Sequence, residues 1–391
     1  MAQSNPLTEK LTLLLVSCLT IMSVMTISPA LPGMSDELNA SGDYDLAIRL
    51  ILTVPALFIA LFSPIAGRLI DRFGRLKFLY VSLAIYGVAG MAGYFLDGLN
   101  SILLSRALLG LAVGMSMTIV VTLVGDYYEG IERQKFIGLQ IAFMSLGGII
   151  FISGGGALAD ISWRHPFLLY GLAFLFLPLA FLFLKEPVRS FQQGNDDNEK
   201  HRSPSYIWLL FLNTMLMWII FFLIPVQVPF LFKEIGVKSN TLIGAAIALS
   251  TAASAISSIS FSKIKGKFNF LSIFGVGYLL MGLGYILISN ANSYGMMISA
   301  MLISGLGIGL MIPNTNLWVM KIAPAQIRGK EIGKLTMFWF FGQFISPIAL
   351  LPFTNNYPLP RVFFIAALIM IALGVIAFLL TISKSVKNKM A

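Results

Sequence analysis

The chain has 391 residues, of which 57% are hydrophobic and only 11% are charged, whereas soluble globular domains carry about 25% charged residues. This composition excludes a water-soluble fold, because a soluble protein of this size needs polar side chains to cover its surface. The net charge of +10 does not indicate a nucleic-acid partner, since the basic residues stand between apolar runs, as in cytoplasmic loops of membrane proteins. Cys18 is the single cysteine, which excludes an intrachain disulfide and a thiolate metal site.

Apolar runs long enough to cross a bilayer as helices recur along the whole chain. Twelve spans are expected, at residues 11–32, 46–69, 77–96, 100–125, 136–158, 166–184, 206–230, 240–261, 270–289, 294–318, 332–352 and 361–382. Residues 185–205 are polar and lack an apolar period, which predicts a flexible cytoplasmic linker. The expected fold is an all-α membrane protein with an N-terminal six-helix bundle at 1–184 and a C-terminal six-helix bundle at 206–391.

The distribution of lysine and arginine predicts the orientation of the chain. Of the 27 Lys and Arg residues, 21 lie near the termini, in the linker or in every second loop, while 5 lie on the opposite side and Arg106 lies within a span. Cytoplasmic segments are the ones enriched in these residues. We therefore expect a multi-pass protein of the cell (inner) membrane with both termini in the cytoplasm.

The two halves of the chain resemble each other at a constant offset of 195 residues. Residues 133–138 align with residues 328–333, and Gly110 aligns with Gly305. Because six helices per repeat is an even number, the two halves share one orientation across the membrane. In transporters of this design the substrate binds near the midplane, between halves that rock around it.

The loop after the second span carries the most specific motif, G-R-L-I-D-R-F-G-R-L-K at residues 67–77. It resembles the loop signature of the major facilitator superfamily, G-x-L-x-D-R-x-G-R. The resemblance implies the twelve-helix major facilitator fold and similarity to the drug–proton antiporter families. Gly67 and Gly74 permit a tight turn and close helix contact. The plainer interpretation is a basic loop that only sets the orientation of the chain.

The resemblance also implies a role for the charged residues of this loop. In relatives, an acid at the inner end of the fourth helix joins the loop in a charge cluster that closes the inner gate. This role is carried over to Asp71, Arg72, Arg75 and Asp126. Because Gly266 stands in the second half where Asp71 stands in the first, the cluster is expected in one half only.

The fourth span contains R-A-L-L-G-L-A-V-G at residues 106–114, which is similar to the superfamily motif R-x-x-x-G-x-x-x-G. Arg106 lies well inside the span, where an arginine costs about 3 kcal/mol on insertion scales. We therefore expect its side chain to face the bundle interior and to serve proton coupling or transport. The alternative is that the side chain extends to the outer membrane interface.

The fifth span matches the exporters of the superfamily only in part. Exporters often carry G-x-x-x-G-P-x-x-G-G, whereas residues 147–156 read G-G-I-I-F-I-S-G-G-G, with Phe151 and Ile152 in place of Gly-Pro. The Trp163-Arg164 pair that follows still resembles the exporter pattern W-R-x-x-F. The glycines predict either a hinge or close helix packing.

In the superfamily, the first, fourth, seventh and tenth helices line a central cavity, and the resemblance extends this role to polar and aromatic residues here. The candidates for the substrate cavity are Ser17, Thr20, Asn213, Gln227, Asn314 and Asn316, with Gln140 added from the fifth span and Trp339 and Gln343 from the eleventh. A hydroxyl in this set could instead bond to its own helix backbone, and Asn316 could instead end the tenth helix.

None of the 17 acidic residues lies deep in an expected span. An unpaired Arg106 would then make the cavity positive, so we expect a neutral or anionic amphipathic substrate. The leading hypothesis is a monomeric, proton-coupled exporter of drugs or metabolites that needs no metal and no cofactor besides the proton gradient. The alternative is an uncoupled facilitator or importer of a neutral solute such as a sugar. A membrane sensor and an enzyme fit less well, because the chain offers neither a signalling domain nor a nucleophile–base pair.

Overall fold

The computed structural model describes residues 6–38, 44–187 and 202–382. These residues form helices and no strand, and they include twelve segments long and apolar enough to span a membrane. The expected all-α fold with twelve spans is thereby confirmed. Most of the expected linker, residues 188–201, lies outside the described residues, and the domain boundaries at 184 and 206 stay predictions.

The first six spans belong to the N-terminal half. They comprise α1 (Pro6–Met25), a 3-10 turn (Ser28–Ala30) and α2 (Leu31–Leu38), then α3 (Asp45–Phe73), α4 (Leu76–Phe95), α5 (Leu99–Tyr127), α6 (Gly130–Ala159), and a 3-10 segment (His165–Gly171) that continues into α7 (Leu172–Phe183). The last six comprise α8 (Ile207–Phe221) with α9 (Leu223–Glu234), then α10 (Asn240–Lys265), α11 (Phe270–Ser289), α12 (Tyr294–Ile322), α13 (Arg328–Asn356) and α14 (Leu359–Ile382).

The first and seventh spans are interrupted, although one continuous helix is expected for each. The helical pattern breaks at Ile27 in the first span and at Phe222 in the seventh. Pro29 and Pro225 follow the two breaks, and proline removes a backbone donor and crowds the preceding helical turn. Ile27 and Phe222 are separated by the same 195 residues as the sequence repeat, so the two halves share the break as well as the motifs.

The eleventh span begins earlier than the expected residue 332, because α13 starts at Arg328. Glu331, which the sequence pattern places in a loop, therefore lies on the first turn of a spanning helix. Its side chain is only 3% exposed. An acid buried near the end of a span is thus present, in addition to the exposed acids of the loops.

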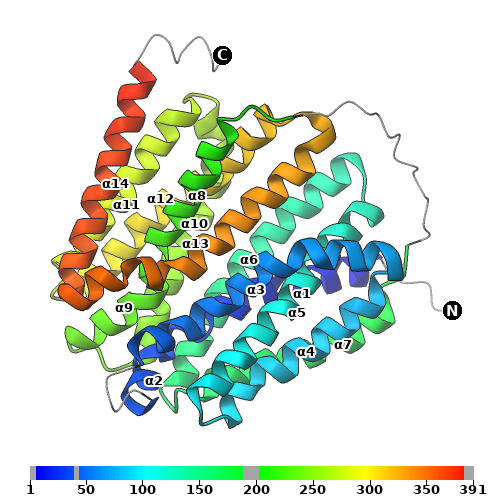
Figure 1. The fold of residues 1–391 in the computed structure, drawn as a ribbon, viewed down its shortest axis with the longest axis horizontal. Coiled ribbons are helices and arrows are strands. Elements are labelled where there is room, and N and C mark those ends of the chain that lie inside the picture. Colours follow the sequence, from blue (N-terminus) through cyan, green and yellow to red (C-terminus); the bar gives the residue numbers. More distant parts are fainter. Residues whose placement is uncertain (1–5, 39–43, 188–201, 383–391) are drawn as a thin grey trace.

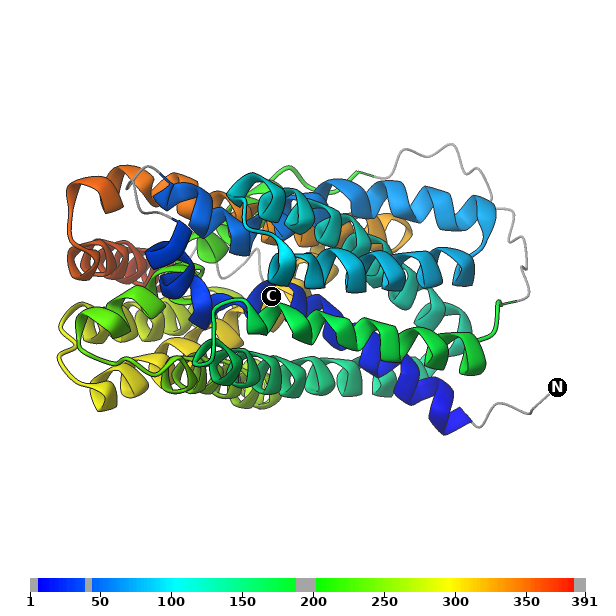
Figure 2. The same ribbon diagram turned by 90° about the horizontal axis from the view of Figure 1, so that it is seen from below.

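The helices pack as two bundles, α1–α7 and α8–α14 (Figure 1). The bundles meet along two seams, where α6 packs along α10 and α3 packs along α13. We call the end of the molecule at which α7 ends and α8 begins the linker side, and the opposite end the far side. In Figure 1 the far-side ends converge at the lower left, whereas the linker-side ends diverge toward the right and the top. Figure 2 shows α1 running from the amino terminus at the right toward the C-terminal bundle at the left.

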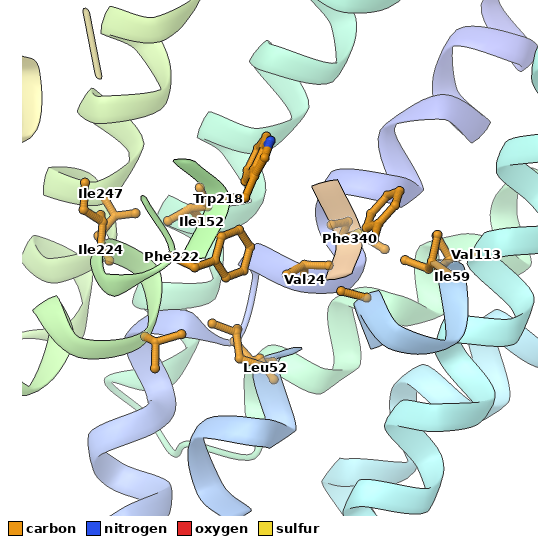
Figure 3. Packing of buried hydrophobic residues seen from close by; sticks show 14 of the residues in the cluster. Val24, Leu52, Ile59, Val113, Ile152, Trp218, Phe222, Ile224, Ile247 and Phe340 are labelled. Atoms are coloured by element: carbon orange, nitrogen blue, oxygen red, sulfur yellow. The ribbon is translucent and has the colours of Figure 1, made fainter. Parts of the chain in front are cut away.

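Apolar side chains fill the region where the two bundles meet (Figure 3). Val24 of the first span and Phe222 of the seventh lie near each other there, together with Ile152 of α6 and Leu52 of α3. All four are buried. The broken spans are therefore packed into one core that both bundles share.

Glycines bring α6 close to its neighbours on the far side. A Cβ atom on Gly155 would collide with the carbonyl group of Thr26, and a Cβ atom on Gly156 would collide with the carbonyl group of Asn240 at the start of α10. Both obstacles are backbone atoms, which cannot turn aside as a side chain can. The glycines at the end of the fifth span thus serve close helix packing, one of the two expected roles.

Candidate functional site

Polar contacts between the bundles gather on the far side. Asp160, the residue after α6, lies against the first residues of α10. Its carboxylate accepts hydrogen bonds from the Asn240 backbone N–H at 2.5 Å, the Thr241 backbone N–H at 3.0 Å and the Ser239 hydroxyl at 3.0 Å. The amino end of a helix leaves such N–H groups unpaired and favours negative charge. Asp160 of one bundle therefore caps a helix of the other.

Two opposing effects act on the carboxyl group of Asp160. Partial burial disfavours the charged form and raises the pKa, while the hydrogen bonds from Thr241, Asn240 and Ser239 favour the charged form and lower the pKa. The hydrogen bonds prevail, so the pKa of Asp160 lies below its ordinary value. The cap on α10 is therefore a carboxylate at neutral pH.

Further polar contacts join the same ends of the bundles. The pairs are Ser28 Oγ with the Pro225 carbonyl oxygen (2.5 Å), Arg49 Nε with Gln227 Oε1 (3.1 Å) and Lys233 Nζ with Asp36 Oδ2 (2.8 Å). We call these three pairs, together with Asp160 and residues 239–241, the far-side latch. Gln227 is an expected cavity residue, but it is 1% exposed and belongs to the latch instead, because Arg49 holds its amide oxygen.

Sequence reasoning missed most of the latch. The sequence places Arg49 within the expected span at 46–69 but predicts neither its burial on α3 nor its bond to Gln227. One local signal was present, because Ser239 directly before α10 is a preferred N-cap residue and its hydroxyl accepts from the Leu242 N–H. That signal predicts where α10 begins, but it does not reveal that Asp160 from the other bundle joins the cap.

A second ionic cluster on the far side lies within the N-terminal bundle. Arg164 Nη2 is 2.9 Å from Asp97 and 3.1 Å from Glu37. Trp163 Nε1 donates a hydrogen bond to Glu37 at 2.6 Å. The Trp-Arg pair of the exporter-like pattern therefore anchors α2 to the loop between α4 and α5.

On the linker side, two of the four expected gate residues form an ion pair. Arg75 Nε lies 3.0 Å from Asp126 Oδ2, and Arg75 Nη2 donates to Asp126 Oδ1 at 3.2 Å. Arg72 lies over the ring of Phe73, with 5.1 Å between its guanidinium carbon and the ring centroid. The side chain of Asp71 lies outside the described part of the structure. The role of this group as an inner gate stays a prediction.

Sequence reasoning also missed a cap on α4. Glu186, which follows α7, accepts hydrogen bonds from the backbone N–H groups of Arg75 at 2.7 Å and Leu76 at 2.8 Å. These donors would otherwise be unpaired at the amino end of the helix. No local pattern identifies Glu186, because it lies more than a hundred residues further along the chain.

The two glycines of the loop motif differ in their surroundings. Gly74 has a φ of 100°, a conformation that other residues rarely adopt, so it makes the expected tight turn after α3. Gly67 lies inside α3, and no atom of the described residues comes within 4 Å of a Cβ atom built there. The close helix contact expected at Gly67 is therefore absent in this arrangement, in which the bundles diverge on the linker side.

Arg106 is fully buried inside the N-terminal bundle. Its Nη2 donates to the carbonyl oxygen of Gly90 at 2.6 Å. Its guanidinium carbon lies 4.7 Å from the ring centroid of Phe167 and 4.8 Å from that of Tyr170. The side chain is thus enclosed by α4 and the sixth span and does not extend to the membrane interface.

This position corrects the expectation of a positively charged central cavity. Within the described residues, Nε and Nη1 of Arg106 have no hydrogen-bond partner, but they are enclosed in one bundle rather than open to the seam between the bundles. Gly90 and Gly93 make the enclosure by letting Tyr170 and Phe167 approach α4, since a Cβ atom on either glycine would collide with these rings. The role of Arg106 in proton coupling stays a prediction.

The remaining cavity candidates near the first span lie together. Gln140 Nε2 of α6 donates to Ser17 Oγ of α1 at 2.8 Å. Ser17 Oγ in turn donates to the carbonyl oxygen of Leu13 in its own helix at 2.7 Å. Thr20, half-buried on the same helix, follows three residues later. The alternative role of bonding to the helix backbone therefore applies to Ser17.

Three candidate asparagines bond within the C-terminal bundle. The pairs are Asn213 Oδ1 with the Tyr278 hydroxyl (2.6 Å), Asn314 Nδ2 with the Phe270 carbonyl oxygen (3.0 Å) and Asn316 Nδ2 with the Ile312 carbonyl oxygen (3.1 Å). Asn314 is fully buried and ties α12 to α11, so it does not line a cavity here. Asn316 does not end the tenth span, because α12 continues to Ile322.

Trp218 and Trp339 form an aromatic pair where α8 meets α13. Their ring centroids are 5.5 Å apart. The indole Nε1 of each ring is buried and has no hydrogen-bond partner among the described residues. Gln343 lies four residues after Trp339, on the same face of α13. Because a buried donor without a partner is costly, these rings offer two N–H groups to an acceptor on a ligand.

Comparison with known proteins relates the chain to transporters. Residues 13–347 and, separately, residues 228–390 match the family model of the Major Facilitator Superfamily. The chain is 31% identical over 183 residues to multidrug resistance protein 1 of Bacillus subtilis (strain 168), an alignment that covers 46% of each chain. It is 25% identical over 203 residues to quinolone resistance protein NorA of Staphylococcus aureus (strain Mu50), which covers 52% of each. The alignments thus span about half the length of these relatives.

Solved structures share the fold over almost the whole chain. A bacterial homolog of the human lysosomal transporter Spinster, in an inward-facing and occupied conformation, has a TM-score of 0.76 at 16% identity and covers 95% of this chain and 96% of its own. A D-xylose–proton symporter has a TM-score of 0.75 at 15% identity, with 95% and 97% covered. At such identities the likeness shows the fold alone.

Proposed function

Because the chain belongs to the Major Facilitator Superfamily, and is thus a multi-pass membrane transporter of small molecules rather than an enzyme, we propose that it exports small amphipathic molecules. Export proceeds by alternating access and is driven by proton antiport. The observation that carries the proposal is the similarity to two relatives named for multidrug and quinolone resistance. The Trp163-Arg164 pair, which holds α2 in place through Glu37, supports it as the part of the exporter pattern that this chain retains.

The proposed orientation places the linker side in the cytoplasm. The basic residues Arg75, Lys330 and Lys334 lie on that side, in keeping with the enrichment of Lys and Arg in cytoplasmic segments. The far-side latch then faces outward and is closed, while the bundles diverge toward the cytoplasm (Figure 1). This arrangement supports a state that receives substrate from the cytoplasm, as an exporter requires.

The proposed substrate is neutral or anionic, and Trp218 and Trp339 with Gln343 are its contact residues. Two indole N–H donors that find no partner among the described residues suit carbonyl or carboxylate oxygens better than a cationic group. Their rings offer apolar surface to the rest of an amphipathic molecule. Arg106 is the proposed proton-coupling residue, acting from inside the N-terminal bundle rather than by contact with the substrate.

The test is an accumulation assay in efflux-deficient cells with cationic, neutral and anionic compounds. We expect the chain to lower accumulation of neutral or anionic compounds, an uncoupler to abolish the effect, and Trp339→Phe to weaken it by removing one N–H donor. Trp318→Phe is the matched control, because Trp318 stacks on Phe270 within the C-terminal bundle. Export of permanent cations alone would contradict the substrate class, and a flux insensitive to the uncoupler would favour the facilitator alternative.

A further inference from the structure

A cavity of about 290 Å³ opens on the linker side of the C-terminal bundle. It lies where α8 and α13 begin, and its lining includes Arg202, Trp208, Lys330, Glu331 and Lys334. The amino ends of both helices lie at this cavity, and the positive end of a helix dipole favours an anion. The cavity plays no part in the transport pathway proposed above.

The charges of the cavity leave a positive excess. Glu331 Oε1 lies 2.9 Å from Lys334 Nζ, so these two charges offset each other. Arg202 and Lys330 remain, and Lys330 is exposed. Glu331 is 3% exposed, and its second oxygen, Oε2, is buried without a hydrogen-bond partner among the described residues. Counting only the part of the chain that the structure describes, the cavity therefore presents two cations for an anion and one buried acceptor that lacks a donor.

An apolar surface leads away from the cavity along α8. Trp208, Leu209 and Leu212 are 49%, 67% and 48% exposed, which gives this end of α8 an apolar surface that acyl chains can cover. Trp208 also packs against Phe338 of α13, with 5.9 Å between ring centroids, and Lys334 Nζ lies 5.7 Å from its ring centroid. Tryptophan beside basic residues is typical of the level of the lipid head groups.

We propose that this cavity binds an acidic phospholipid whose head group carries hydroxyl groups, as in phosphatidylglycerol. The phosphate pairs with Lys330 and Arg202 at the two helix ends, and a head-group hydroxyl donates to Glu331 Oε2. The acyl chains follow the exposed face of α8 past Trp208. A basic cavity between helices at the cytoplasmic surface is a recognised setting for anionic head groups. The apolar path beside it favours a lipid over a free phosphate ion.

The experiment is native mass spectrometry of the full chain titrated with phosphatidylglycerol, phosphatidylcholine or inorganic phosphate. We expect bound phosphatidylglycerol, weaker binding of phosphatidylcholine, which lacks a hydroxyl donor, and no competition from inorganic phosphate at equal concentration. Lys330→Glu should weaken binding of phosphatidylglycerol by about tenfold or more, since it removes one cation and puts a repelling negative charge in its place. Because Lys330 is exposed, Lys330→Glu should fold like the wild type, and weaker lipid binding would not be due to loss of folding.

The matched control is Lys263→Glu, which reverses an exposed charge on the same side but outside this cavity. It should bind phosphatidylglycerol as the wild type does. Equal losses in the two variants, or no loss in Lys330→Glu, would overturn the site. Equal competition by inorganic phosphate would overturn the assignment of the ligand as a lipid. The experiment measures lipid binding, so a negative result would not contradict the proposed transport function.

Discussion

The hydroxyl of Ser28 donates a hydrogen bond to the carbonyl oxygen of Pro225, 2.5 Å away, and thereby joins the broken first span of one bundle to the broken seventh span of the other. In a continuous helix this carbonyl would accept from the residue four positions further on. That residue is Pro229, which has no N–H. Ser28 supplies the missing donor from the opposite bundle, so the carbonyl is satisfied only while the far-side ends stay together.

Replacing Ser28 by alanine should therefore loosen the far-side latch. The Pro225 carbonyl would be buried without a donor, at a cost of about 1–3 kcal/mol, and the open arrangement would gain population. Electron–electron resonance distances between spin labels at Ile161 and Lys238, exposed positions on the two bundles, should include a longer component. Ser299→Ala is the control, because the Ser299 hydroxyl donates to Gly295 of its own helix. Identical distances in Ser28→Ala and the wild type would contradict the role of this bond.

The contact of Asp160 with α10 should respond to strong acid and not to mild acid. Its pKa lies below the ordinary value of 3.8, so the contribution of the carboxylate is fully present above that value and is lost as the pH falls through the lowered pKa. The same label distance should stay constant from about pH 7 to about pH 5 and lengthen only below about pH 4.

Asp160→Asn provides the control for this pH dependence. The variant lacks the negative charge at every pH, so its label distance should be longer at neutral pH and should not change in acid. A change between about pH 7 and about pH 5 that persists in Asp160→Asn would assign the response to another group. The expectation for Asp160 would then be wrong.

The twelve spans and the repeat could be predicted from the sequence because both depend on local patterns. A span needs only about 20 apolar residues in a row, and the repeat needs only matching motifs at one offset. The breaks at Ile27 and Phe222 could also be inferred from the sequence, since Pro29 and Pro225 follow them. Proline is tolerated in membrane helices, however, so its presence alone does not decide between a break and a mild bend.

The partners of polar side chains could not be predicted in the same way. Gln227 is a polar residue within a span, of the kind expected to line a cavity. Arg49, which lies 178 residues earlier, instead binds it in the latch. Asn314 likewise bonds to a carbonyl group of the neighbouring helix. Which face of an apolar helix meets which neighbour depends on packing, and a span with apolar residues all round carries no period that reveals it.

Gly156 should be intolerant of even the smallest side chain. A Cβ atom there would collide with the Asn240 carbonyl group, which belongs to the backbone at the start of α10. Gly156→Ala should force α6 and α10 apart on the far side, at a cost of about 1–3 kcal/mol. Thermal unfolding and efflux of the same variant would measure the loss.

Gly154 offers a matched control two residues away on the same helix. Within the part of the chain that the structure describes, no atom lies within 4 Å of a Cβ atom built on Gly154. Gly154→Ala should therefore unfold at the wild-type temperature or slightly above it, since alanine favours a helix over glycine by about 0.5–1 kcal/mol. Equal tolerance of both substitutions would mean that the close approach of α6 and α10 does not limit stability.

The charge of Arg106 should matter for transport more than for folding. The sequence repeat places Met301 at the equivalent position of the second half, and Met301 is buried as fully as Arg106. The fold thus accommodates an uncharged side chain of similar length there. Burying a guanidinium group carries a desolvation cost that an apolar side chain avoids. Arg106→Met should therefore unfold no earlier than the wild type.

Proton-driven transport by Arg106→Met should nevertheless fall by about tenfold or more if Arg106 serves proton coupling. Both quantities can be measured on one preparation, as thermal unfolding and as substrate flux in liposomes with an imposed proton gradient. Arg68→Met, which removes an exposed arginine on α3, should change neither. If Arg106→Met lost both thermal stability and transport, Arg106 would be a packing residue, held by Gly90 and Tyr170. Unchanged transport would remove Arg106 from the coupling mechanism.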